Sequence, residues 1–318
     1  MNKSKIAILG STSHIAKGLI NNFLQSGEFS LHLYTTSLDK LCNFLGSIGK
    51  SADKDCIVHK GYENFNKSSY DVIINCVGVG TYNKLQGNYS NYFIVTEEYD
   101  NLVIDYLCNN YSEALYISIS SGAVYGRAFS KPVEKNTMNC IDVNHINTED
   151  YYGIARLNSE AKHRAFKNLR IVDLRIFSYF SRFIDLTDGY FITEVMDCIL
   201  NKKLLVTNDM NFIRDYVHPE DLFSMIRKCM DAGKINVAFD VTSAKPVEKR
   251  EILDYFSLEY GLKYEISRSL SHVSATGSKN IYCSNYNNAA CIGYKPAFSS
   301  MDAIEQESKY ILNILTDD

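Results

Sequence analysis

The sequence predicts an α/β fold in which a doubly wound parallel sheet is covered by helices on both faces and followed by a smaller C-terminal lobe. Short, nearly continuous apolar runs alternate with longer helical patterns over the first half of the chain. Such runs are typical of parallel strands that are buried on both faces. Beyond residue 177 the alternation loosens, so we expect a second lobe at the C-terminal edge of the sheet.

The first half of the chain supplies the alternating elements. Strands are predicted at Ile6–Leu9, Ser30–Thr35, Asp71–Gly78, Leu115–Ser120 and Arg170–Phe177. Helices are predicted between them at His14–Gln25, Ser37–Ile48, Tyr89–Asn109 and Glu149–Lys167. Gly27 ends the first helix, because glycine is common just after a helix C-terminus. Each strand is thus joined to the next by a helical or irregular crossover, as a parallel sheet requires.

The C-terminal part has a less regular pattern. Helices are predicted at Gly189–Asn201, Pro219–Ala232, Val247–Tyr260 and Met301–Leu315, and extended segments at Leu204–Thr207 and Asn236–Thr242. We expect residues 1–177 to form the sheet domain and residues 178–318 to form mainly the second lobe. Part of the latter, about 204–243, is expected to return to the sheet.

Composition and charge exclude several classes of protein. Of 318 residues 46% are apolar and 22% charged, which is ordinary for a globular protein and excludes a disordered chain. The net charge of −4 offers no basic excess for nucleic acid. No run approaches the ~18 apolar residues of a membrane helix. No signal peptide is indicated, and the nine cysteines contain no C-x-x-C pair. We therefore expect a cytoplasmic protein with reduced thiols and no metal site.

The turn after the first strand predicts a dinucleotide site. In such sites a glycine permits the tight turn, and small residues let a pyrophosphate approach the free N–H groups of the following helix. Here Gly10 provides the glycine, while Ser13 and Ala16 are small residues where glycine is commoner. His14 is either a phosphate donor or an exposed turn residue. The predicted cofactor contacts from this turn and from the end of the third strand are Gly10, Thr12, Ser13, His14, Ile15, Cys76, Val77 and Gly78.

The end of the second strand bears on which dinucleotide is bound. An NAD site usually has an acidic residue there, which holds the ribose 2′-hydroxyl. This chain has Thr35 and Thr36 instead, with Lys40 nearby. Because no carboxylate repels a 2′-phosphate, we predict contacts from both threonines and a preference for NADP, with NAD as the alternative.

Several later segments resemble the extended short-chain dehydrogenases/reductases, the group of nucleotide-sugar epimerases, dehydratases and ketoreductases. The fourth predicted strand is followed by the segment Ser120-Ser121-Gly122-Ala123-Val124-Tyr125-Gly126. Tyr152 lies 31 positions after Ser121, at the start of a predicted helix. Two further segments carry the resemblance. One is Arg214-Asp215-Tyr216-Val217-His218, and the other runs from Cys283 to Pro296, before the last predicted helix, and ends in Ile292-Gly293-Tyr294-Lys295-Pro296. The resemblance covers nearly the full chain. It implies a Rossmann dinucleotide-binding domain at 1–177 and a mainly substrate-binding lobe at 178–318.

The resemblance also implies catalytic roles. Tyr152 would be the acid/base, Ser121 would hydrogen-bond the reacting oxygen, and the position four residues after Tyr152 would bind the nicotinamide ribose. That position is normally lysine and is Arg156 here. Arginine keeps the positive charge but is planar, longer and never deprotonated. The alternative for Tyr152 taken alone is a packed aromatic residue at a helix start, but its combination with Ser121, Gly10 and the order of the strands favours the catalytic role.

Substrate contacts follow from the same resemblance. Arg214 resembles the arginine that grips a nucleotide diphosphate, with a salt bridge to Asp215 as the alternative. Ser178 stands where the family often has an asparagine that touches the diphosphate or sugar. Arg182 is a further candidate for a substrate phosphate, although Asp185 is a possible structural partner.

Two differences between this chain and the family pattern argue against particular reactions. Gly122 and Ala123 stand where family dehydratases carry Asp-Glu, which argues against a 4,6-dehydratase. The cysteine needed by enzymes that invert two carbons is absent from the same stretch. Our first interpretation is an NADP-dependent ketoreductase acting on a nucleotide-linked 4-keto sugar. The alternatives are a nucleotide-sugar 4-epimerase that retains NAD, and a cofactor-binding protein that has lost catalysis.

A homodimer is expected, as in many relatives of this group. The helices predicted at Tyr89–Asn109 and Glu149–Lys167 would pack against their mates as a four-helix bundle. Phe93, Leu102 and Leu157 could contribute to that interface or equally to the monomer core.

Overall fold

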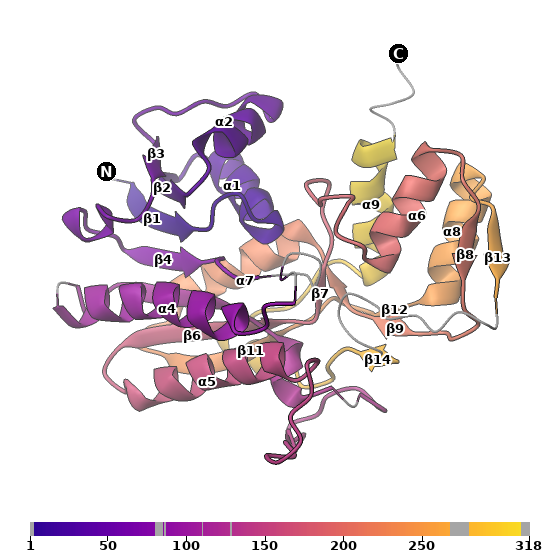
Figure 1. Ribbon diagram of the computed structural model, residues 1–318. Coiled ribbons are helices and arrows are strands. Elements are labelled where there is room, and N and C mark those ends of the chain that lie inside the picture. Colours follow the sequence, from indigo (N-terminus) through magenta and orange to yellow (C-terminus); the bar gives the residue numbers. More distant parts are fainter. Residues whose placement is uncertain are drawn as a thin grey trace.

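A seven-stranded, fully parallel sheet forms the centre of the computed structural model, which describes residues 3–79, 85, 87–109, 111–127, 129–267 and 280–312 (Figure 1). The strand order is β3-β2-β1-β4-β5-β6-β11. The strands are β1 (Ser4–Leu9), β2 (Phe29–Thr35), β3 (Cys56–Lys60), β4 (Val72–Asn75), β5 (Leu115–Ser121), β6 (Arg170–Ile176) and β11 (Asn236–Val241). The predicted doubly wound α/β fold is confirmed.

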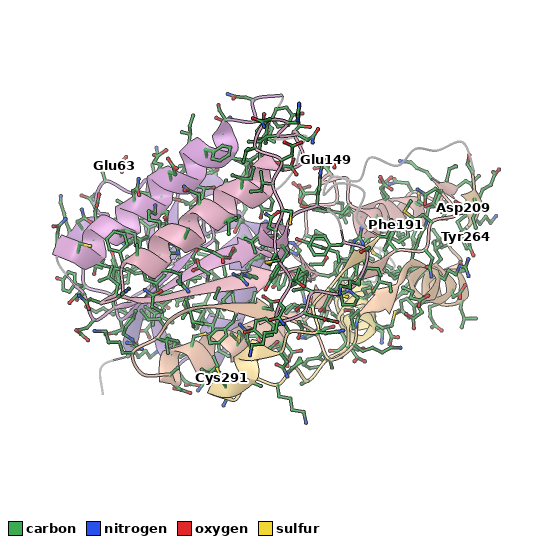
Figure 2. All side chains as sticks on the ribbon, turned by 90° about the horizontal axis from the view of Figure 1, so that it is seen from below. Glu63, Glu149, Phe191, Asp209, Tyr264 and Cys291 are labelled. Carbon is green, nitrogen blue, oxygen red and sulfur yellow. The ribbon has the colours of Figure 1, made fainter. Side chains whose placement is uncertain are left out.

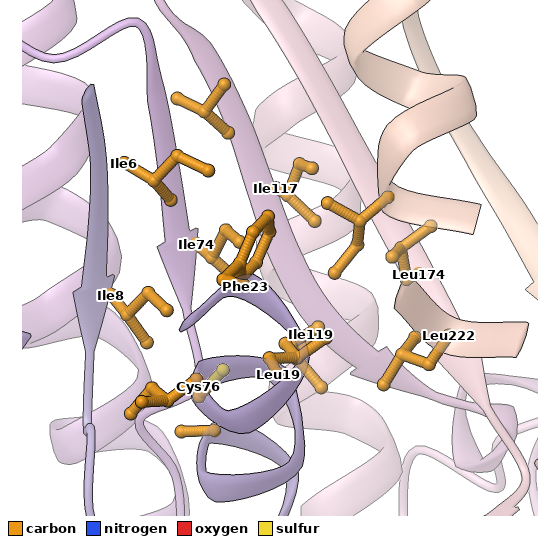
Figure 3. Close-up of a cluster of buried hydrophobic side chains, with 14 of the residues drawn as sticks. Ile6, Ile8, Leu19, Phe23, Ile74, Cys76, Ile117, Ile119, Leu174 and Leu222 are labelled. Carbon is orange, nitrogen blue, oxygen red and sulfur yellow. The ribbon is translucent and has the colours of Figure 1, made fainter. Parts of the chain in front are cut away.

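Helices cover both faces of this sheet. One face packs against α1 (His14–Ser26), α2 (Leu38–Ser47) and α7 (Pro219–Asp231), and the other against α4 (Asn91–Asn109) and α5 (Tyr151–Ala165). Figure 3 shows part of the first interface, where side chains of α1 and α7 meet apolar side chains of β1, β4, β5 and β6. Each large apolar side chain that is fully buried there contributes about 1.5–3 kcal/mol, so this layer holds the sheet domain together.

The C-terminal lobe has its own apolar core. Its helices are α6 (Phe191–Leu200), α8 (Lys249–Tyr260) and α9 (Ser300–Leu312), which bury a second cluster of side chains. Short strands complete the lobe in three small sheets. These are β7 (Ser178–Tyr179) with β10 (Tyr216–Val217), β8 (Leu205–Thr207) with β13 (Tyr264–Ile266), and β9 (Ile213–Arg214) between β12 (Val247–Glu248) and β14 (Ile281–Tyr282). Single 3₁₀ turns lie at η1 (Phe65–Lys67), η2 (Gly122–Tyr125) and η3 (Asn288–Ile292).

The structure differs from the sequence-based prediction in a few places. Strand β3 was not predicted, because it is an edge strand that pairs only with β2 and its pattern is half polar. The strand predicted over Asp71–Gly78 leaves the sheet after Asn75. Of the strands within 204–243, β11 pairs with β6 whereas β8 pairs with β13. Residues 313–315 of the last predicted helix lie outside the described residues.

The cysteine side chains form no disulfide bonds. All nine cysteines are free, and Cys56, Cys76, Cys229 and Cys283 are buried. Across the part of the chain that the structure describes, no helix combines the length and the apolar character needed to cross a membrane.

A buried ionic cluster ties α5 to the sheet and to α4. The fully buried ring of His163 on α5 has Nε2 2.6 Å from Asp100 Oδ1 of α4 and Nδ1 2.8 Å from Asp173 Oδ1 of β6. Burial alone lowers the pKa of His163, but the hydrogen bonds to the two carboxylates outweigh it and raise the pKa from 6.5 to about 9. The protonated ring therefore donates to both carboxylates at neutral pH.

This cluster predicts a pH-dependent stability. The folded chain binds one proton more than the unfolded chain between pH 6.5 and about 9, so the free energy of unfolding should fall as the pH rises through this range. We expect a loss on the order of 1–3 kcal/mol, measured by urea unfolding at several pH values. A His163→Gln variant should be less stable throughout and lack this decline. A wild-type stability that stays constant over the range would contradict the assignment.

Candidate active site

A cleft of about 1380 Å³ lies at the carboxyl ends of the strands, where the sheet domain meets the C-terminal lobe. It spans the position between β1 and β4 at which the strand order reverses, the usual ligand site of a doubly wound sheet. Its volume exceeds the roughly 300–1,000 Å³ that one drug-sized ligand needs, so it has room for a dinucleotide and a second ligand. Figure 2 labels Glu149, just before α5, and Phe191, at the start of α6, which both line it.

The cleft brings together nearly all of the predicted site residues. Those that line it are Gly10, Thr12, Ser13, His14, Ile15, Thr35, Thr36, Cys76, Val77, Gly78, Ser121, Tyr152, Arg156, Ser178 and Arg214. They come from the ends of β1, β2, β4 and β5, from the first turns of α1 and α5, and from β7 and β9 of the second lobe.

The turn between β1 and α1 requires a glycine at its first position. Gly10 has φ +70°, and a Cβ there would lie 3.0 Å from the backbone carbonyl carbon of Cys76 and 3.0 Å from the nitrogen of Val77. Ser13 caps α1, and its side chain accepts a hydrogen bond from the Ala16 N–H. Backbone amides at the start of α1 therefore line the cleft where an anion can approach them.

His14 bridges this turn to the second lobe. Its Nε2 lies 2.8 Å from Ser181 Oγ, and its ring packs edge-on against Tyr179, with 4.9 Å between ring centroids. The side chain thus lines the cleft and is half-buried, rather than being the exposed turn residue that the sequence also allowed.

The end of β2 has no carboxylate. The cleft-lining residues from this strand end and from α2 are Thr35, Thr36, Lys40, Asn43, Phe44 and Ser47. Thr35 is buried, and its Oγ1 accepts a hydrogen bond from the Ser37 N–H at 3.0 Å, whereas Thr36 is exposed. Lys17 of α1 also lines the cleft, with Nζ 5.7 Å from the centre of the Phe44 ring. Positive charge therefore flanks this end of the cleft.

Arg156 lies against the end of β4. Its Nη2 is 3.5 Å from the Val77 carbonyl oxygen, and a Cβ on Gly78 would come within 2.3 Å of the same nitrogen. Its guanidinium carbon is 5.5 Å from the centre of the Tyr152 ring, one helical turn earlier. Among the described residues, the buried Nε of Arg156 has no hydrogen-bond partner. A buried cation with an unsatisfied donor is suited to a polar ligand in the cleft.

Ser121 ends β5, and its hydroxyl is held by two neighbours. It accepts a hydrogen bond from the Ala123 N–H at 3.2 Å, and it lies 3.0 Å from the hydroxyl of Tyr282. Tyr282 comes from β14 in the second lobe and also lines the cleft. Sequence reasoning missed Tyr282, since it belongs to no motif and stands 161 positions from Ser121.

Arg214 is a buried cation that lines the cleft from β9 of the second lobe. Its Nη1 donates to the Ile213 carbonyl oxygen at 2.9 Å, and its guanidinium stacks 4.5 Å from the centre of the Phe212 ring. Burial lowers its pKa. The alternative partner Asp215 instead accepts from the Ser243 N–H at 2.8 Å. Within the described ranges, no carboxylate forms an ion pair with Arg214, so its charge is available to an anion.

Arg182 lies outside the cleft. Its guanidinium pairs with Glu307 of α9, with Nη2 2.6 Å from Oε1 and Nε 3.0 Å from Oε2. The head group also stacks on the Tyr310 ring, 3.0 Å from the ring centre. The predicted phosphate contact of Arg182 is therefore not supported, and its partner is Glu307 rather than Asp185.

The fold and the cleft together define a class of protein, the nicotinamide-dinucleotide-dependent enzymes of the extended short-chain dehydrogenase/reductase type. The model of the NAD dependent epimerase/dehydratase family matches residues 6–241, and the chain belongs to this family. The resemblance stated from the sequence is therefore confirmed. No curated protein matches the chain's sequence.

Solved structures with the same fold cover at least 98% of this chain at low sequence identity. A UDP-glucose-4-epimerase from Stenotrophomonas maltophila is 14% identical over 100% of both chains, with a TM-score of 0.81. A UDP-N-acetylglucosamine 4-epimerase from Methanobrevibacter ruminantium is 16% identical over 99% of this chain and 100% of its own, with a TM-score of 0.80. A UDP-glucuronic acid 4-epimerase from Bacillus cereus is 15% identical over 98% and 99%, also with a TM-score of 0.80.

The contact between Gly78 and Arg156 generates a prediction. A Gly78→Ala variant should push the guanidinium aside, because the new Cβ would occupy its place. We expect about tenfold weaker dinucleotide binding by calorimetry, the effect of ~1.4 kcal/mol, with little change in melting temperature. Arg156→Lys in the same background should restore binding, since lysine has no branched head group at that point. Gly46→Ala on α2, with nothing within 4 Å of its new Cβ, is the control. Unchanged binding in Gly78→Ala would contradict the role of this packing.

Proposed function

We propose that this protein is a nucleotide-sugar 4-epimerase that keeps a nicotinamide dinucleotide bound. The observation that carries the proposal is the buried Arg214, which is not paired with any described carboxylate and shares one cleft with Ser121 and Tyr152. A planar guanidinium suits the oxygens of a diphosphate. The three similar structures named above are all nucleotide-sugar 4-epimerases, and this favours the epimerase over the ketoreductase that we placed first from the sequence.

The residues present fit a dinucleotide. Gly10 keeps the start of α1 open to a pyrophosphate, and the Arg156 Nε offers an unsatisfied donor beside the end of β4. The dinucleotide held by these residues would supply reversible hydride transfer at C4 of the sugar. Tyr152 would take the proton of the 4-hydroxyl and give it back, Ser121 would hydrogen-bond the same oxygen, and Arg214 would hold the diphosphate. Ser178 would add a hydroxyl near that diphosphate.

A ketoreductase is a second candidate because of the residues that line the cleft at the end of β2. Lys17 and Lys40 line it, and the end of β2 carries no acid. Both features favour a 2′-phosphate and therefore NADP(H), the usual reductant in biosynthesis. An epimerase consumes no net hydride, so either dinucleotide could serve it.

One assay separates these reactions from a cofactor-binding protein without catalysis. The protein as purified is denatured, and the released ligands are identified by mass spectrometry. In parallel, UDP-glucose, UDP-N-acetylglucosamine and UDP-glucuronic acid are supplied without added cofactor, and the 4-epimers are sought by chromatography. Retained oxidised dinucleotide with epimer formation supports the proposal. Turnover only of a 4-keto sugar nucleotide with NADPH supports the ketoreductase, and binding without any turnover supports the non-catalytic alternative.

The dimer expected from the sequence is also a proposal. Ile94 on α4 is 56% exposed, whereas Phe93 packs against Tyr151 and Leu102 packs against the core of the sheet domain. The outward faces of α4 and α5 would then meet a second copy through Ile94 and the half-buried Leu157. A monomeric mass by light scattering at micromolar concentration would contradict this arrangement.

Variants of the Tyr152–Arg156 pair test the assigned acid/base. Tyr152→Phe should lower turnover by ~10²–10⁴-fold, the range of a lost general acid, and leave the fold intact. Arg156→Ala should weaken cofactor binding, whereas Arg156→Lys should retain or raise activity because it restores the residue usual in the group. Steady-state kinetics and circular dichroism provide the readouts, and the adjacent Tyr151→Phe is the control. Full turnover in Tyr152→Phe would show that another group is the acid.

Cofactor choice is tested at the end of β2. Thr36→Asp should repel a 2′-phosphate and shift the ratio of NADPH to NADH affinity by about tenfold or more toward NADH. Thr36 is exposed and accepts the change, whereas Thr35 is buried and hydrogen-bonded. Thr36→Asn, which has the same shape without the charge, is the matched control in calorimetry. Tighter NADH than NADPH binding in the unmodified protein would overturn the NADP preference.

A further inference from the structure

Tyr282 is a buried tyrosine in the cleft that the proposed function does not use. It is 4% exposed and lines the cleft from β14. Its hydroxyl is 3.0 Å from Ser121 Oγ, and its ring packs against Phe129 and Phe177, with centroid distances of 5.0 Å and 5.2 Å. The aromatic contacts hold the ring, so the hydroxyl has a fixed position beside the Ser121 side chain.

Ser121 has a limited capacity for hydrogen bonds, and the structure allows it to be counted. A serine hydroxyl donates one hydrogen bond and accepts two. One acceptor position of Ser121 is taken by the Ala123 N–H at 3.2 Å, and the Tyr282 oxygen accepts from the same N–H. Between Ser121 and Tyr282 either oxygen could donate, but a phenol is a stronger donor and a weaker acceptor than an aliphatic alcohol. When Tyr282 donates, both acceptor positions of Ser121 are filled and its single proton is left for a third partner.

We propose that Tyr282 is a positioning residue that donates to Ser121 and thereby directs the Ser121 proton toward the 4-oxygen of the sugar. This inference rests on the proposed function, because it deepens the role of Ser121 at the same site. Without Tyr282, the Ser121 hydroxyl could rotate and donate elsewhere. Burial raises the pKa of Tyr282, so the phenol stays protonated and able to donate at neutral pH.

The same strand places this donor beside the grip on the diphosphate. β14 pairs in parallel with β9, and the register sets Tyr282 next to Arg214. The small sheet of the second lobe therefore carries both the cation for the diphosphate and the hydroxyl that orients Ser121 of the first lobe. Ser121 is thus oriented by the lobe that would hold the substrate.

A double-mutant cycle in turnover tests the proposal. Tyr282→Phe removes only the hydroxyl, and it should lower kcat roughly 10–100-fold while KM changes less than about threefold. In the Ser121→Ala background, Tyr282→Phe should lower kcat no further, because the Ser121 hydroxyl through which Tyr282 acts is gone. Tyr294→Phe is the matched control. It removes a buried hydroxyl that donates to the Thr242 carbonyl oxygen at 3.0 Å outside the cleft, and it should leave kcat unchanged.

Several results would overturn the inference. An unchanged kcat in Tyr282→Phe does so directly. An equal loss in the Ser121→Ala background also does so, because Tyr282 would then act on the substrate itself. If the wild type binds UDP-sugars without turning them over, the proposed function fails, and the same cycle is then measured in affinity for the UDP-sugar. Losses of affinity in Ser121→Ala and Tyr282→Phe that add up in the double variant would overturn this inference. If the wild type does not bind UDP-sugars either, the cycle is measured in melting temperature. Decreases in the two single variants that add up in the double variant disprove the Tyr282–Ser121 hydrogen bond. A decrease in the double variant that is smaller than their sum supports it.

Discussion

The position of α5 is the constraint on which the candidate site depends, and a buried ion cluster sets that position. His163, near the C-terminal end of the helix, is clamped between Asp100 of α4 and Asp173 of β6. Removing one partner from such a cluster leaves a buried charge uncompensated, which costs several kcal/mol. Tyr152 and Arg156 lie in the first turns of the same rigid helix. The contacts of His163 near the C-terminal end of α5 therefore determine where these two side chains enter the cleft at the N-terminal end of the helix.

A second set of polar contacts ties α5 to the strands beside it. Glu160 accepts a hydrogen bond from Ser120 Oγ at 2.7 Å and forms an ion pair with Arg175 of β6 at 2.6 Å. Ser120 immediately precedes Ser121, so the carboxylate that anchors the helix also anchors the end of β5. The hydroxyl of Ser121 and the phenol of Tyr152 are therefore positioned by one network, as the roles proposed for them at a single oxygen would require.

The arginine at position 156 shows how the cleft accommodates a departure from the usual pattern of the group. A guanidinium is longer and wider than a lysine ammonium, and it needs space at the end of β4. Gly78 supplies that space, since any Cβ there would meet the Arg156 Nη2 at 2.3 Å. At 13–16% identity to the solved structures with the same fold, the chain keeps that fold, and its own cleft holds Arg156 beside Gly78.

Local patterns in the sequence predicted the parallel sheet and the turn at Gly10, because buried strands and tight turns impose residue types on neighbouring positions. Ser121 and Tyr152 were singled out by the resemblance to the family. Tertiary structure alone decided which partners meet across the chain. Arg182 pairs with Glu307, 125 positions away, and Ser121 meets Tyr282, 161 positions away. Such contacts depend on how two lobes pack against each other, and packing between distant segments leaves no periodicity or motif in either of them. The choice between epimerase and ketoreductase is of the same kind, since both reactions use the same local residue pattern and differ in how the assembled cleft holds the sugar.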